Sequence, residues 1–148
     1  MRMSSIAVEL TARCNQKCTY CYNAWRDDGG AAMGELDHDT LMGLLDKLLD
    51  ENELEYVTLT GGEPFVRKDI HRIIDHLNDR GKGVVIISNG GMIQPDTIEA
   101  LKGQWIHYIQ ITLAGANAET HDAVAGSCLL YTSPSPRDQR GSRMPSSA

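Results

Sequence analysis

The chain has 148 residues, of which 41% are hydrophobic and 23% are charged, and its formal net charge is −6. This length suits one domain with a substantial core, and the composition is typical of a soluble globular protein. The acidic balance disfavours a surface for nucleic acid or anionic lipid, and no run of about 18 apolar residues predicts a membrane span.

Hydrophobic patterning predicts four strands along the chain. The first is the short apolar run SIAVEL at residues 5–10, which contains β-branched members. Three further apolar runs follow, at residues 56–60, 84–88 and 106–112.

Helical spacing separates these strands. From Asp37, a possible N-cap, leucines recur at the spacing of one helix face, beginning with Leu41. A second apolar face spans 70–77 and ends before Gly81, and Pro95 suits the first turn of a third helix. Asn117 is placed to cap a further helix.

Strands that alternate with helices predict an α/β fold with a parallel sheet and about four βα units. A doubly wound sheet and a β/α barrel both fit this order. Unusual residues follow each strand at once: cysteines after the first, then GGEP, SNGG and TLAG. Because β/α barrels assemble their sites from the carboxyl ends of strands, we expect a truncated, partial TIM-like barrel.

The composition changes near Ser127, and three of the five prolines lie beyond it. Such an end is typical of a disordered tail. Reverse translation of residues 128–138 and 142–148 also produces strings that resemble sequencing-library adapters, in one frame and in the expected order. We therefore expect residues 1–127 to be the N-terminal part of a domain and residues 128–148 to be a non-native, disordered tail, with no role for Cys128.

Three of the four cysteines, Cys14, Cys18 and Cys21, lie within eight residues. No signal-peptide pattern precedes them, so we expect a cytoplasmic chain in which clustered thiols serve metal or redox chemistry. The C-x3-C-x2-C spacing lacks the second ligand pair of a zinc site and the nearby fourth thiolate of a ferredoxin. It favours a [4Fe–4S] cluster with one iron left open. A zinc-binding or iron–sulfur electron-transfer module is the alternative.

The segment CNQKCTYC, with Tyr20 before its last cysteine, resembles the radical S-adenosylmethionine (SAM) superfamily. GGEP at 61–64 resembles the second motif of the same family, and the resemblance covers nearly all of residues 5–127. It implies that Cys14, Cys18 and Cys21 ligate three irons of a [4Fe–4S] cluster. SAM would then occupy the fourth iron through its amino and carboxylate groups.

The same resemblance implies which residues contact SAM. Gly61 and Gly62 would let the backbone approach its methionine end, Glu63 would accept from its ammonium group, and Pro64 would stiffen the turn.

Three strand-end residues, Ser88, Asn89 and Thr112, lie where the family touches the ribose and methionine parts of SAM. Turn formation or helix capping explains these residue types equally well. Many relatives have Asp where this chain has Ala114, so that contact is unassigned. No residue is assigned a catalytic role. The aromatic residues of the cysteine region, Tyr20, Tyr22 and Trp25, are candidates to pack around the cluster or adenine, but single aromatic residues are more often core, which is the interpretation taken here.

The implied reaction is reductive cleavage of SAM to a 5′-deoxyadenosyl radical that abstracts hydrogen from a substrate. Residues 9–23 most resemble the branch that modifies peptides or proteins, often with extra C-terminal clusters, although members acting on molybdopterin or haem intermediates look similar. The implied partners are SAM, a peptide or small-molecule substrate and an electron donor such as flavodoxin or ferredoxin. The fragment as given is expected to be inactive.

Overall fold

The computed structural model describes residues 4–23 and 34–126, so the expected tail, Cys128 and Trp25 lie outside the described residues. Two groups of elements make up this part of the chain. The strands are β1 (Ser5–Glu9), β2 (Tyr56–Thr60), β3 (Gly83–Ser88) and β4 (Ile106–Ile111). The helices are α1 (His38–Glu51), the 3-10 helix η2 (Pro64–Val66), α2 (Ile70–Asp79), α3 (Pro95–Leu101) and α4 (Ala118–Ala125). The four predicted strands are confirmed to within one residue at each end.

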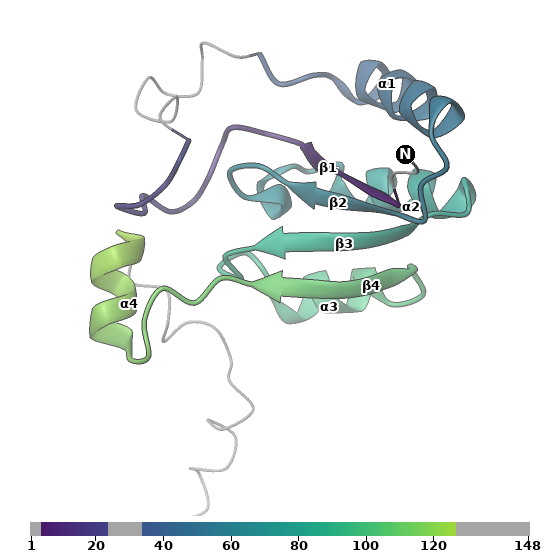
Figure 1. Cartoon of the computed structure of the whole chain (residues 1–148). Helices are drawn as coiled ribbons and strands as arrows, with labels where there is room; N and C mark the ends of the chain where they lie inside the picture. The colour runs from purple at the N-terminus through teal and green to yellow at the C-terminus, as the bar shows by residue number, and fades with distance from the viewer. Residues whose placement is uncertain (1–3, 24–33, 127–148) are drawn as a thin grey trace, which may run out of the picture.

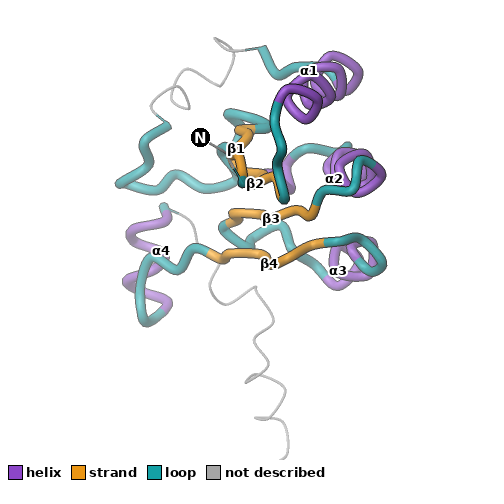
Figure 2. Tube along the Cα trace, turned by 45° about the vertical axis from the view of Figure 1, so that its right-hand side comes forward, coloured by secondary structure: helices purple, strands orange, loops and turns teal. Residues whose placement is uncertain are grey.

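The strands form one parallel sheet in the order β1-β2-β3-β4. Helices α1, α2 and α3 cover one face of this sheet, and α4 lies beyond the carboxyl ends of the strands (Figure 1 and Figure 2). A doubly wound sheet reverses its strand order and carries helices on both faces, whereas a barrel adds each strand on the same side. The partial TIM-like barrel is therefore confirmed.

The hydrophobic core lies between the sheet and the helices. Because side chains alternate along a strand, every second residue of β2 and β3 points into this core. These residues are Val57, Leu59, Val84 and Ile86. The helices contribute Leu41, Leu45 and Leu49 from α1 and Ile70, Ile73, Ile74 and Leu77 from α2. Leu44, which shares the leucine spacing of α1, is exposed, so the buried stripe of this helix is narrower than its sequence suggests.

The predicted helix boundaries have the expected capping contacts. Asp37 Oδ1 accepts from the Thr40 amide at 2.9 Å, and Asn117 Oδ1 accepts from the Thr120 amide at 2.9 Å. Gly81 follows α2 with φ of +69°, a left-handed conformation that glycine adopts at little cost. These local signals were readable from the sequence because each depends on residues within one helical turn.

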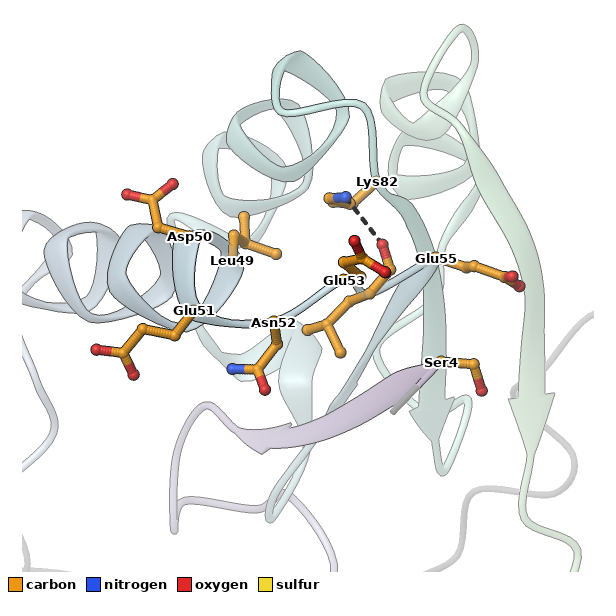
Figure 3. A pocket seen from close by; sticks show the side chains of 9 residues that line it. Ser4, Leu49, Asp50, Glu51, Asn52, Glu53, Glu55 and Lys82 are labelled. Atoms are coloured by element: carbon orange, nitrogen blue, oxygen red, sulfur yellow. Dashed lines mark hydrogen bonds between the residues drawn. The ribbon is translucent and has the colours of Figure 1, made fainter. Parts of the chain in front are cut away.

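The amino ends of β1, β2 and β3 form an acidic, polar edge. There Lys82 Nζ donates to the Leu54 carbonyl at 2.8 Å, beside Asp50, Glu53 and Glu55 (Figure 3). None of the predicted site residues lies at this edge. No helix within the described ranges has the length and apolar character needed to cross a bilayer.

Candidate functional site

The pairing of β1 with β2 continues beyond both strands and brings the GGEP turn against the cysteine loop. The Gly62 amide donates to the Thr11 carbonyl at 2.7 Å, and the Glu63 amide donates to the Arg13 carbonyl at 2.9 Å. Two segments about 50 residues apart in sequence are thereby joined at the carboxyl edge of the sheet.

The two glycines of this turn permit that close approach. Gly61 has φ of +134°, and a Cβ placed on it would lie 2.4 Å from the Thr11 carbonyl oxygen. A Cβ on Gly62 would lie 2.2 Å from the Arg13 carbonyl oxygen. A side chain at either position would overlap the backbone of the cysteine loop, because real Cβ atoms do not come so close to other atoms. Glycine at both positions therefore lets the loop pack directly against the turn.

One hollow collects residues that follow all four strands. It is lined by the three cysteines, by Gly61 and Gly62, and by the strand-end residues Ser88, Asn89 and Thr112. Gln16, Tyr20, Tyr22, Thr60 and Ile87 complete the lining. Of the site residues predicted from the sequence, all but Glu63 and Pro64 line this hollow. The convergence of strand ends expected from the barrel is therefore present.

Glu63 lies behind the hollow and is completely buried. Its Oε1 accepts from Ser88 Oγ at 2.9 Å and from the Phe65 amide at 3.2 Å, and its Oε2 accepts from the Asn89 amide at 2.8 Å. Burial raises the pKa of Glu63, although these three donors act in the opposite direction. The carboxyl group therefore ties the GGEP turn to the loop after β3, and Pro64 begins η2 beside it.

Polar groups lie close to the sulfurs of Cys14 and Cys18, and those at Cys14 include two hydrogen-bond donors. The Gln16 amide donates to Cys14 Sγ at 3.4 Å, and Asn89 Nδ2 approaches the same sulfur at 3.6 Å while donating to Asn15 Oδ1 at 2.7 Å. The Cys18 thiol lies 3.4 Å from Gln16 Oε1. Burial raises the pKa of Cys14, and the Gln16 amide lowers it in part.

The cysteines fit a cluster that binds each thiolate through a separate iron. Within the described residues Cys14, Cys18 and Cys21 are not joined in disulfides, and all three line one hollow. Amide donors directed at a sulfur are the contacts that tune iron–sulfur clusters. Within residues 4–23 and 34–126, no three His, Cys, Asp or Glu side chains are grouped closely enough to hold one metal ion.

A partly buried network of ion pairs and hydrogen bonds, not anticipated from the sequence, holds the start of the cysteine loop. Glu35 Oε2 accepts from Thr11 Oγ1 at 2.7 Å and from Arg13 Nε at 2.8 Å. Arg67, only 3% exposed, donates to both oxygens of Asp69 at 2.9 and 2.8 Å. These bonds hold the pKa of Asp69 well below its usual range. Arg13 and Glu35 are 22 positions apart, a separation that gives no sequence pattern to reveal their pairing.

The core interpretation of the aromatic residues was wrong where the structure describes them. Tyr20 is 57% exposed and Tyr22 is 69% exposed, and both line the hollow. Tyr22 also donates its hydroxyl to Glu9 Oε1 at 3.0 Å. They lie on the loop that follows β1, beyond the carboxyl edge of the sheet.

Known proteins resemble this chain over most of its length. The model of the radical SAM superfamily matches residues 8–129. The chain is 35% identical over 121 residues to the AdoMet-dependent heme synthase of Methanosarcina barkeri, which covers 82% of this chain and 34% of that protein. It is also 35% identical over 118 residues to the mycofactocin maturase MftC of Mycobacterium ulcerans, covering 80% of this chain and 31% of that one.

A solved structure supports the fold. SuiB of Streptococcus suis, crystallised with the precursor peptide SuiA, matches with a TM-score of 0.70 at 20% identity, covering 85% of this chain and 28% of that one. The chain thus spans about a third of the length of the curated relatives it matches. Because the family model covers most of the chain, and the fold matches independently, this chain belongs to the radical SAM superfamily.

Proposed function

We propose that this chain provides the cluster- and SAM-binding part of a radical SAM enzyme. The observation that carries the proposal is the single hollow in which Cys14, Cys18 and Cys21 meet the Gly61–Gly62 turn and the ends of β3 and β4. When bound, the [4Fe–4S] cluster and SAM supply a 5′-deoxyadenosyl radical that abstracts hydrogen from the substrate.

The protein's own contribution is to bind and orient. The three thiolates would each hold one iron, and amide donors near Cys14 would stabilise charge on its sulfur. The rigid turn at Gly61–Gly62 and the polar strand ends of Ser88, Asn89 and Thr112 would hold SAM beside the open iron. Glu63 would act from behind the hollow, by fixing Ser88 and Asn89. The contact with the SAM ammonium group that the sequence predicts would require its buried carboxylate to become accessible.

We infer that the reaction matures a peptide or protein. Support comes from the motif resemblance and from the 35% identity to a maturase. The equal identity to a heme synthase favours a haem-pathway intermediate as the second candidate. A flavodoxin or ferredoxin would supply the electron, in the cytoplasm.

Metal analysis of the chain tests the cluster assignment. After anaerobic reconstitution we expect about four irons and four sulfides per chain, and loss of iron in Cys14→Ala, Cys18→Ala and Cys21→Ala. Cys128→Ala is the matched control and should load normally. One zinc per chain with no sulfide would overturn the proposal and support the zinc-binding alternative.

The substrate class is tested by isotope transfer in a protein that also carries the sequence following these strands in its relatives. Deuterated precursor peptide should pass deuterium to 5′-deoxyadenosine. Transfer from a deuterated haem precursor, with none from peptide, would reject peptide maturation.

A further inference from the structure

The carboxyl end of α4 contacts the cysteine loop on both sides of its middle cysteine. The Lys17 amide donates to the Ala125 carbonyl at 3.1 Å, and the Thr19 amide donates to the Val124 carbonyl at 2.9 Å. The last carbonyls of a helix lack partners within the helix, so they are available to such donors. Figure 1 shows α4 beside this loop, beyond the ends of the strands.

The residue after α4 must be small for this contact to form. Gly126 caps the helix with φ of +62°, and its amide donates to the Asp122 carbonyl. A Cβ on Gly126 would lie 2.5 Å from the Lys17 carbonyl oxygen and 3.1 Å from the Lys17 carbonyl carbon. Because both are backbone atoms, no side-chain rotation relieves that overlap.

The other end of α4 is anchored independently. Asn117 caps the first turn through the Thr120 amide, and the buried His121 accepts from the Ala114 amide at 3.1 Å through Nδ1. The helix is therefore held to the segment after β4 and presents its last carbonyls to the loop from a fixed position.

We propose that the carboxyl end of α4 is a clasp that sets the position of Cys18, with Gly126 as its positioning residue. The inference rests on the proposed function, because its purpose is to hold three sulfurs at the spacing that a cluster requires. Cys14 is held separately, by contacts with Gln16 and Asn89. The clasp thus supplies the second fixed point of a loop that has no regular secondary structure.

Two glycines with similar backbone conformation distinguish the effect of losing this contact from the effect of backbone strain. Gly81 has φ of +69°, close to that of Gly126, but no atom lies within 4 Å of a Cβ built on it. Gly126→Ala and Gly81→Ala therefore carry similar conformational strain, and only the first collides with the loop. Since Asn tolerates left-handed backbone, Gly126→Asn and Gly81→Asn repeat the comparison with less strain.

The first readout needs no iron. In the reduced chain without a cluster, peptide mass spectrometry measures the alkylation rate of each cysteine. Loss of two backbone hydrogen bonds should raise the rate at Cys18 about tenfold in the Gly126 variants, with little change in the Gly81 variants. Asn117→Ala removes the N-cap at the far end of α4. It should also increase the alkylation rate of Cys18, relative to wild type, by more than it increases the rate of Cys14.

The second readout is iron content after anaerobic reconstitution. We expect the Gly126 variants to load less iron than the Gly81 variants of equal thermal stability. Equal alkylation rates at Cys18 across both pairs and in Asn117→Ala would overturn the clasp. Failure of the unmodified chain to bind iron would contradict the proposed function instead, while the alkylation readout would still decide whether the clasp exists.

Discussion

Replacement of Glu63 tests how the GGEP turn holds the loop after β3. In Glu63→Ala the Phe65 and Asn89 amides lose their acceptor, whereas the Ser88 hydroxyl can rotate toward another partner. Each buried amide left without an acceptor costs about 1–3 kcal/mol. Removal of a buried carboxyl group returns part of this, so we expect a net loss of about 2–4 kcal/mol in the free energy of unfolding.

Glu63→Gln is the graded control. Its single carbonyl oxygen can face either the Phe65 amide or the Asn89 amide, and either orientation leaves one of them unpaired. The expected loss is therefore roughly half that of Glu63→Ala, about 1–2 kcal/mol. The assay is urea unfolding followed by circular dichroism, with anaerobic iron loading measured on the same samples.

The pH dependence of this comparison has a defined sign. The pKa of Glu63 is raised by burial, so its contribution to stability is fully present below its ordinary value of 4.5 and is lost as pH rises through the folded value. The difference in the free energy of unfolding between wild type and Glu63→Gln should therefore shrink as pH rises.

The Glu63→Ala variant decides the main question. A loss below about 0.5 kcal/mol in its free energy of unfolding would show that the three hydrogen bonds do not hold the turn.

Three further predictions concern the cysteine site, the ion network and the sheet edge. Asn89→Ala removes the side-chain donor near Cys14 Sγ and should lower the midpoint potential of a reconstituted cluster, measured by redox titration; an unchanged potential would contradict that contact. Asp69, whose pKa is lowered by hydrogen bonds from Arg67, stabilises the fold above its ordinary 3.8 and loses this effect as pH falls. The stability difference between wild type and Asp69→Asn should thus shrink between about pH 4 and pH 2 in urea titrations, and a constant difference would refute this. The exposed β4 edge, where Tyr108 is 56% exposed, should promote self-association, which Tyr108→Lys should reduce in sedimentation velocity.

The sequence alone determined the helices and strands and the family to which the chain belongs. Strand and helix periods, Asp37 and Asn117 as caps, and Gly81 as a helix end all depend on neighbours within a few residues, so one-dimensional patterns reveal them. The cysteine spacing and the GGEP turn likewise identified the family that the comparisons confirm.

Only the tertiary structure decided which residues, distant in the sequence, contact one another at the site. It placed Glu63 behind the hollow, bound to Ser88 and Asn89, and left Tyr20 at the exposed rim. It also paired the end of α4 with the cysteine loop, across more than 100 residues of sequence. Such contacts form where the packing of β/α units brings backbone carbonyls and amides together. Every residue has these backbone groups, so residue types in the sequence do not reveal which of them will meet. Local periodicity therefore specifies the elements, whereas the approach of their ends is set by packing of the whole sheet.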